Sequence, residues 1–152
     1  MDLPGIRERD HEADFYSEEF LRRIFAENHV FALVGASPDP SRPSHGTMAF
    51  LQRVGFRVIP VNPREAGSEI LGEPVRRTLA DIPEPVDVVD VFRKGSAVAG
   101  LAEEAIAIAA RVLWLQLGIV DLVAANRAEE AGLSVVMNRC PQIEHPRLFG
   151  RR

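Results

Sequence analysis

Cysteine and long apolar runs are scarce in this 152-residue chain, and each scarcity excludes a class of protein. The single cysteine, Cys140, rules out an intramolecular disulfide framework and fits a reducing compartment. No apolar run approaches the ~18 residues of a membrane span. The N-terminal stretch MDLPGIRERDHEADF is too charged for a signal peptide. We therefore expect a soluble, cytoplasmic protein with no membrane partner.

Positive charge is also in short supply. The chain carries 18 Lys and Arg residues against 22 Asp and Glu residues, a net charge of −4. Nucleic acid is not expected as the main partner, because binding a phosphate backbone requires a basic face. With 46% hydrophobic and 26% charged residues, the composition is that of an ordinary globular protein. The length favours a single domain.

The nucleotide-binding motifs that are easiest to recognise are missing. Only Gly35 is present where the dinucleotide fingerprint G-x-G-x-x-G requires three glycines. The second expected strand ends in Asn62, where an NAD-binding protein has Asp or Glu. There is no G-x-x-x-x-G-K-[ST] either, which argues against a nucleoside triphosphatase. NAD and nucleoside triphosphates are therefore poor candidates as ligands.

Apolar runs and helical periodicities alternate along the chain. Residues 1–16 are polar and predict an N-terminal arm ahead of a domain over 17–152. The pattern predicts strands over 30–34, 56–61, 86–92, 112–116 and 133–137, and helices over 17–28, 45–54, 96–110 and 121–131. Near Ile70 we expect a short β-like piece, and around 78–81 a brief helix. The tail from Asn138 has too little periodicity to assign.

This alternation predicts an α/β fold, a single-domain Rossmann-like parallel sheet of about five strands with helices on both faces. We expect the strand order 3-2-1-4-5 rather than the flavodoxin-like 2-1-3-4-5. The first strand would then neighbour the fourth. Pro60 fits poorly in a central strand, and Pro63 blocks extension of the same strand.

The stretch 31–55, FALVGASPDPSRPSHGTMAFLQRVG, organises the rest of the chain. Its apolar run ends at Gly35, a proline-rich loop follows, and apolar residues then recur at helical spacing. Strand, turn, loop and helix in this order form the first half of a βαβ unit. Backbone N–H groups and a helix N-terminus can face an anion there, which predicts a phosphate-binding loop.

Cations follow four of the five expected strands. Ligands of open α/β sheets lie outside the carboxyl ends of the strands. The loops at those ends carry Arg42, Arg64, Arg93, Lys94 and Arg139. Such a polarised rim favours an anionic ligand. The alternative is that these are ordinary charged loops.

No catalytic constellation emerges. Ser37 lacks the second glycine of the hydrolase motif G-x-S-x-G, and the four histidines have no metal-ligand spacing. Cys140 is close in sequence to Glu144 and His145, but a structural cysteine is favoured over a thiol–base pair. His45 could contact a phosphate or simply begin a helix.

Carboxylate pairing is not expected either. Asp87 and Asp90 alternate with valines, so their side chains would lie on opposite faces of a strand and could not act as an acid–base pair.

Five motifs in order carry a family resemblance. They are VGASPDPSRPSHG at 34–46, VIPVNPREAGSEILGEPV at 58–75, VDVVDVFRKG at 86–95, VLWLQLGI at 112–119 and AGLSVVMNRCP at 131–141. With these motifs, residues 20–149 resemble the stand-alone CoA-binding proteins. These are similar to the N-terminal CoA-binding domain of the succinyl-CoA synthetase α subunit.

The resemblance implies a Rossmann-like domain that binds the ADP portion of coenzyme A. It implies that the pyrophosphate meets Gly35, Ala36, Ser37, Arg42, His45 and Gly46. It places the adenosine and its 3′-phosphate near Val61, Asn62, Pro63 and Arg64. It places Phe92 and Arg93 beside the adenine or the phosphates, and it lines the pantetheine path with Gln116, Leu117 and Gly118.

The chain departs from the synthetase in two respects. Its phosphate loop is rich in proline instead of glycine, and the synthetase's phosphohistidine segment has no counterpart. Ligase activity is therefore not transferred, and the expected function is non-catalytic binding of CoA or an acyl-CoA. Two alternatives stay open. One is an enzyme acting on a CoA thioester with Cys140 or His45 as its reactive group, and the other is a binder of NAD or FAD.

Overall fold

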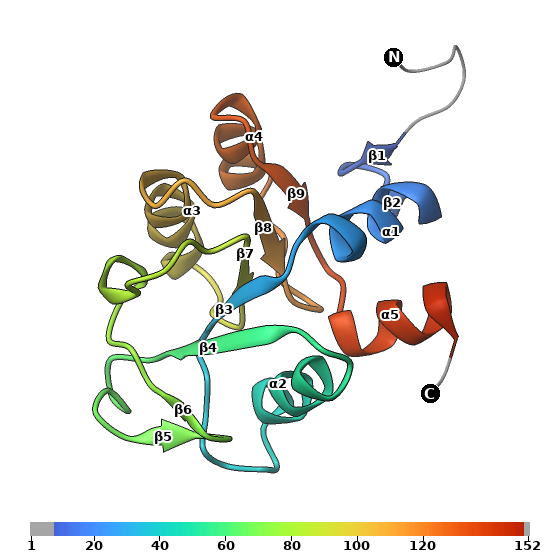
Figure 1. Ribbon diagram of the computed structural model, residues 1–152. Coiled ribbons are helices and arrows are strands. Elements are labelled where there is room, and N and C mark those ends of the chain that lie inside the picture. Colours follow the sequence, from blue (N-terminus) through green and yellow to red (C-terminus); the bar gives the residue numbers. More distant parts are fainter. Residues whose placement is uncertain (1–7, 151–152) are drawn as a thin grey trace.

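A parallel five-stranded sheet forms the centre of the computed structural model, which describes residues 8–150 (Figure 1). The strands lie in the order β4-β3-β7-β8-β9. Their bounds are Arg57–Val61 for β4, Val30–Val34 for β3, Val88–Val91 for β7, Val112–Leu115 for β8 and Ser134–Val136 for β9. Nearly every residue of these strands is buried, as expected for a sheet covered on both faces.

Helices cover both faces of the sheet (Figure 1). On one face, α3 and α4 pack through small residues such as Ala102 and Ala125. On the other face, α1, α2 and α5 pack with bulkier residues, including Phe25 and the fully buried Trp114. The helices span Glu18–Glu27 (α1), Pro43–Arg53 (α2), Ala97–Ala107 (α3), Leu122–Glu130 (α4) and Pro141–Phe149 (α5). The predicted α/β class and the helices on both faces are confirmed.

The predicted strand order 3-2-1-4-5 is wrong. The third main strand, β7, pairs with the first, β3, from Phe31↔Val88 to Val34↔Val91, so the observed order is 2-1-3-4-5. Among the residues that the structure describes, the far edge of β4 makes one isolated parallel bridge, Val61↔Arg76. Pro60 explains this edge position, because it lacks the N–H that a full ladder requires.

Short elements complete the sheet's surroundings. β5 (Glu69–Ile70) and β6 (Glu73–Pro74) form a small antiparallel pair, and a 3₁₀ turn, η1, spans Leu79–Asp81. Both match the pieces expected near Ile70 and over 78–81.

Residues 8–16 of the predicted arm lie against the rest of the domain, whereas 1–7 lie outside the described residues. β1 (Arg9–Asp10) pairs with β2 (Phe15–Tyr16). The buried Tyr16 accepts a hydrogen bond from the Met137 N–H, just after β9, at 2.8 Å. This part of the arm is therefore tied to the β9 end of the sheet.

Helix α5 was not expected from the sequence. Its two prolines obscure the helical pattern, although Pro141 stands in the first turn, where it is tolerated. The ring of His145 packs against phenylalanine rings, with centroid distances of 5.2 Å to Phe25 and 4.8 Å to Phe149. The helix thus closes an aromatic cluster on the α1 side of the sheet.

Candidate functional site

A cavity of about 850 Å³ opens at the carboxyl edge of the sheet. It extends across the loops that follow β4, β3, β7 and β8, four adjacent strands. After β3 the chain adds β4 on one side of it and then crosses to add β7 on the other side. The boundary between β3 and β7 is therefore the topological switch point, and the cavity extends across it. We call it the switch-point cavity. It is lined by Gly35, Ala36, Ser37, Arg42, Pro43, Ser44, Asn62, Pro63, Arg64, Glu65, Phe92, Arg93, Lys94, Gln116, Leu117 and Ile119.

Gly35 permits the close approach of two loops at this switch point. Its φ of +91° is unfavourable for other residues. A Cβ at this position would lie only 3.1 Å from the Phe92 carbonyl oxygen and 3.2 Å from the Phe92 Cβ. The Phe92 N–H donates to the Val34 carbonyl at 2.8 Å, which joins the ends of β3 and β7. A glycine is therefore required at this position, where the loop after β3 meets the loop after β7.

The proline-rich loop after Gly35 is held by its own polar groups. The Asp39 carboxylate accepts hydrogen bonds from the Ser41 N–H at 2.9 Å and the Ser41 hydroxyl at 2.8 Å. These bonds lower the pKa of Asp39. The loop leads into α2, whose first residue is Pro43, so the N-terminus of this helix faces the cavity. Backbone N–H groups at such a terminus can bind an anion.

Asn62 joins the first two loops of the cavity. Its Nδ2 donates to the Ala36 carbonyl at 2.8 Å, and its Oδ1 accepts from the Arg64 N–H at 2.9 Å. The amide thereby fixes the β3 loop against the β4 loop. This structural role explains why an amide follows β4 in place of the carboxylate that binds a ribose in NAD proteins.

Four of the five predicted rim cations line the cavity, namely Arg42, Arg64, Arg93 and Lys94. All four are exposed, and within residues 8–150 none of them forms an ion pair. Unpaired cations grouped around one cavity attract an anionic ligand.

The fifth predicted cation, Arg139, does not belong to this group. Its Nη1 donates to the Asp14 carboxylate at 2.8 Å, and its guanidinium lies 4.9 Å from the centroid of the Tyr16 ring. The Asp14 pairing anchors the β1–β2 segment and neutralises the charge. The segment around Asp14 carries no sequence signal that would have revealed this pairing.

Four residues that the resemblance assigned to the site do not line the cavity. The Val61 carbonyl accepts the Gly35 N–H at 3.0 Å, and the His45 N–H is bonded to the Arg42 carbonyl at 3.1 Å inside α2. Gly46 faces α5, and the Gly118 N–H donates to Asn138 at 2.7 Å. The sequence reasoning did not assign Pro43, Ser44, Glu65 or Ile119, although each is next to or near a predicted residue.

Gln116 adds a buried polar group to the β8 side of the cavity. The residue is 8% exposed, and within the described part of the chain its Oε1 has no hydrogen-bond partner. A buried acceptor of this kind is costly unless a ligand or water donates to it.

The candidate nucleophile Cys140 is buried. Its Sγ lies 3.7 Å from the Thr47 hydroxyl oxygen, and the neighbouring Glu144 accepts a hydrogen bond from Arg147 at 2.7 Å. Residues 8–150 contain no cluster of three or more His, Cys, Asp or Glu side chains that could hold a metal ion. The surroundings of Cys140 are those of a packed structural residue.

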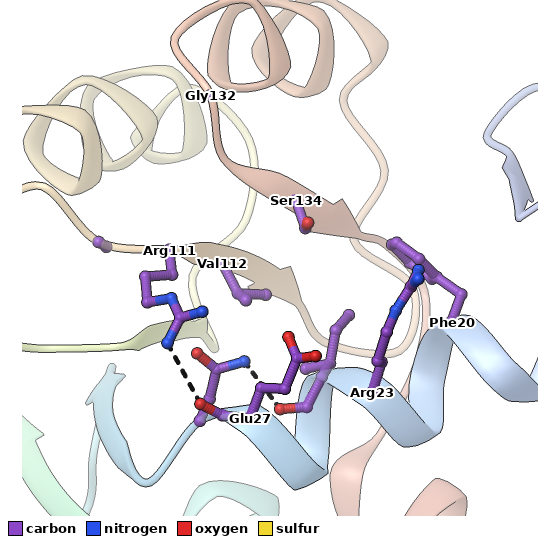
Figure 2. Close-up of a pocket in the computed structure, with 10 residues that line it drawn as sticks. Phe20, Arg23, Glu27, Arg111, Val112, Gly132 and Ser134 are labelled. Carbon is purple, nitrogen blue, oxygen red and sulfur yellow. Dashed lines mark hydrogen bonds between the residues drawn. The ribbon is translucent and has the colours of Figure 1, made fainter. Parts of the chain in front are cut away.

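A second, smaller cavity of about 280 Å³ lies at the opposite edge of the sheet, between α1 and the starts of β8 and β9 (Figure 2). Arg111 lines it and donates to the Glu27 carbonyl at 3.2 Å, and Arg23 pairs with Glu8. Its two arginines are thus engaged by the protein itself. The switch-point cavity is therefore the stronger candidate.

An open α/β sheet with a cation-lined cavity at its switch point defines a class of ligand-binding α/β domains. Comparison with known families shows which family of this class the chain belongs to. The sequence model of the family described as CoA binding domain matches residues 29–146. The chain belongs to this CoA-binding domain family.

Two relatives match most of the chain. The protein YneT of Bacillus subtilis (strain 168) is 35% identical over 129 residues, which are 85% of this chain and 94% of YneT. A solved structure from Thermus thermophilus is 41% identical, with a TM-score of 0.84, and the match covers 88% of this chain and 99% of that one.

A larger enzyme shares the fold. The dinucleotide-forming acetyl-coenzyme A synthetase 1 of Ca. Korarchaeum cryptofilum, solved with phosphate and ADP, matches 76% of this chain at 25% identity and a TM-score of 0.64. The match covers 26% of the synthetase chain. Separately, none of the helices formed by residues 8–150 has the length and apolar character needed to cross a bilayer.

Proposed function

We propose that the protein binds coenzyme A or an acyl-CoA through its ADP moiety in the switch-point cavity, as a binding module that catalyses no reaction. The observation that carries this proposal is the group of four cations that form no ion pair within residues 8–150 and lie beside a helix N-terminus, in a member of the CoA-binding domain family. A CoA molecule presents a pyrophosphate and a 3′-phosphate, which such donors can hold by charge-assisted hydrogen bonds.

In this proposal, each part of the ligand is bound by the loops that follow particular strands. The β3 loop, with Gly35 to Ser37 and Arg42, would hold the pyrophosphate at the start of α2. Arg64 after β4 and Arg93 after β7 are the candidates for the 3′-phosphate. Gln116 and Leu117 after β8 would line the path of the pantetheine.

The buried position of Cys140 and the position of His45 outside the cavity lining support a non-catalytic role. Cytoplasmic location and the exclusion of nucleic-acid and membrane partners stay predictions from the sequence.

Titration calorimetry with CoA, dephospho-CoA and NAD tests the proposal. We expect CoA to bind at least tenfold more tightly than dephospho-CoA, because a lost charged hydrogen bond costs about 1.5–3 kcal/mol. Arg64→Gln or Arg93→Gln should remove most of this difference. Arg127→Gln is the matched control, since Arg127 pairs with Glu103 on the surface at 3.0 Å and does not line the cavity. Equal affinity for NAD and CoA would contradict the proposal.

A further inference from the structure

We propose that the physiological ligand is a thioester with an apolar acyl chain, which lies on the exposed apolar residues that follow β8. This inference rests on the proposed function and specifies the class of acyl group. The apolar residues are Leu117, Val120, Leu122 and Val123, named here the β8–α4 surface.

Exposed apolar side chains are concentrated on this surface. Leu117 is 48% exposed, Val120 57%, Leu122 39% and Val123 81%. Four other large hydrophobic residues are exposed within residues 8–150: Phe15 in β2, Leu71 between β5 and β6, and Ile143 and Phe149 in α5. Single exposed apolar residues are ordinary, but a concentration of them marks a binding surface.

The backbone of this surface is fixed. The Ile119 N–H donates to the Gln116 carbonyl at 2.9 Å, and the Gly118 N–H donates to the Asn138 side chain at 2.7 Å. Asp121 then caps α4 by accepting the Ala124 N–H at 3.0 Å. The apolar side chains are therefore held toward solvent by an ordered loop and the first turn of a helix.

The surface is continuous with the switch-point cavity. Leu117 belongs to both, and the buried Ile119 lines the cavity between Leu117 and Val120. A chain that leaves the cavity on the β8 side therefore meets Val120 and the start of α4.

The charge of the residues that line the cavity also changes from one end to the other. Its cations follow β4, β3 and β7, whereas the segment after β8, from Gln116 to Val120, carries no charge. Strands lie about 4.8 Å apart, so three steps from β4 to β8 span roughly 14 Å. An acyl-CoA has the same polarity, with a phosphorylated nucleotide at one end and an apolar chain at the other.

Chain length gives the size of the expected effect. Complete burial of one methylene strengthens binding by about fourfold. A chain that lies on an open surface buries roughly half of the area of each methylene, which strengthens binding by about twofold per methylene. Octanoyl-CoA has six more methylenes than acetyl-CoA and should therefore bind on the order of 50-fold more tightly.

Calorimetry with CoA, acetyl-CoA, butyryl-CoA and octanoyl-CoA tests the inference on the full chain and on the double variant Val120→Ser/Val123→Ser. We expect the variant to keep its affinity for CoA and to lose most of the gain with chain length. Leu71→Ser is the matched control, because Leu71 is 39% exposed and its carbonyl accepts a hydrogen bond from Gln52, near the end of α2 away from the cavity.

The outcomes separate the two proposals. CoA binding without a gain from chain length, or a gain that the double variant retains, overturns the acyl inference alone. A dimer in sedimentation that Val123→Ser dissociates would assign the surface to a second copy of this chain and would likewise overturn it. No binding of CoA or of any thioester overturns the proposed function itself.

Discussion

Asp90 lies at the centre of β7, in register with Leu33 on one side and Trp114 on the other. Its carboxyl group is fully buried, and neither oxygen has a hydrogen-bond partner within the described residues. Burial raises the pKa of Asp90 well above its ordinary value. Because burial disfavours the ionised form, this carboxyl group keeps its proton to a higher pH in the folded protein than in the unfolded chain.

Replacing Asp90 by Asn should make the folded state less sensitive to pH. The unfolded carboxyl group ionises near pH 4, whereas the folded one keeps its proton to higher pH, so the folded state binds more protons in this window. The free energy of unfolding of the wild type should therefore fall as pH rises, by up to about 1.4 kcal/mol per pH unit. Asp90→Asn removes this loss.

Urea unfolding of both proteins at pH 4, 5.5 and 7 measures the effect. We expect the variant to gain stability over the wild type as pH increases. Glu104→Gln, which changes an exposed carboxylate of α3, is the control and should show no such trend. If the difference in the free energy of unfolding between Asp90→Asn and the wild type did not vary with pH, Asp90 would ionise in the folded protein at the same pH as in the unfolded chain.

At the scale of elements, most boundaries followed from local patterns, but the order of the strands did not. Periodicity identified α1 to α4 and the five strands because each is a short apolar segment with recognisable ends. Strand order depends on which edges accept a neighbour, and only Pro60 carried that information. Its missing N–H argued for an edge position of β4, which the expected order contradicted.

The β1–β2 segment illustrates a contact that local patterns cannot predict. Tyr16 lies far from β9 in sequence, yet its hydroxyl accepts the N–H of Met137, which is 1% exposed. Burial raises the pKa of Tyr16 to about 12. The phenol therefore stays protonated near neutral pH, and stability linked to its ionisation falls only as pH rises above about 10 toward that value.

Tyr16→Phe should destabilise the protein by about 1–3 kcal/mol, because it leaves the buried Met137 N–H without its acceptor. Urea unfolding measures this loss, and Phe15→Leu, at an exposed neighbour, is the control. The chain has a single tyrosine, so titration of phenolate absorbance reports Tyr16 alone. An unchanged free energy of unfolding would mean that the β1–β2 segment does not support β9.

At the scale of the whole molecule, the rim could be predicted even though the strand order was wrong. The carboxyl ends of parallel strands meet at one edge whatever their order, so Arg42, Arg64 and Arg93 gather there in either arrangement. Which of these loops lie next to one another, however, depends on the order of the strands. The true arrangement brings Phe92 directly against Gly35, where the expected one would have placed the loop after β8.

The distribution of charge makes a final prediction about binding. The molecule carries a net charge of −4, yet the switch-point cavity is lined by four cations that have no ion-pair partner in the described part of the chain. If the net charge governed the approach of an anionic ligand, added salt would screen repulsion and strengthen binding. If the cavity cations govern it, added salt should weaken binding.

Distance decides between these effects. At 0.1 M salt the screening length is about 10 Å, so the acidic groups on distant parts of the surface are largely screened, while cations in contact with the ligand are screened less. We therefore expect the dissociation constant for CoA to rise by about tenfold between 0.05 and 0.5 M NaCl, as the remaining attraction is screened. Calorimetry across this range should give a smaller rise for Arg64→Gln and an unchanged one for Arg127→Gln. An affinity for CoA that increases with salt would show that the net charge of the molecule outweighs the cations of its cavity.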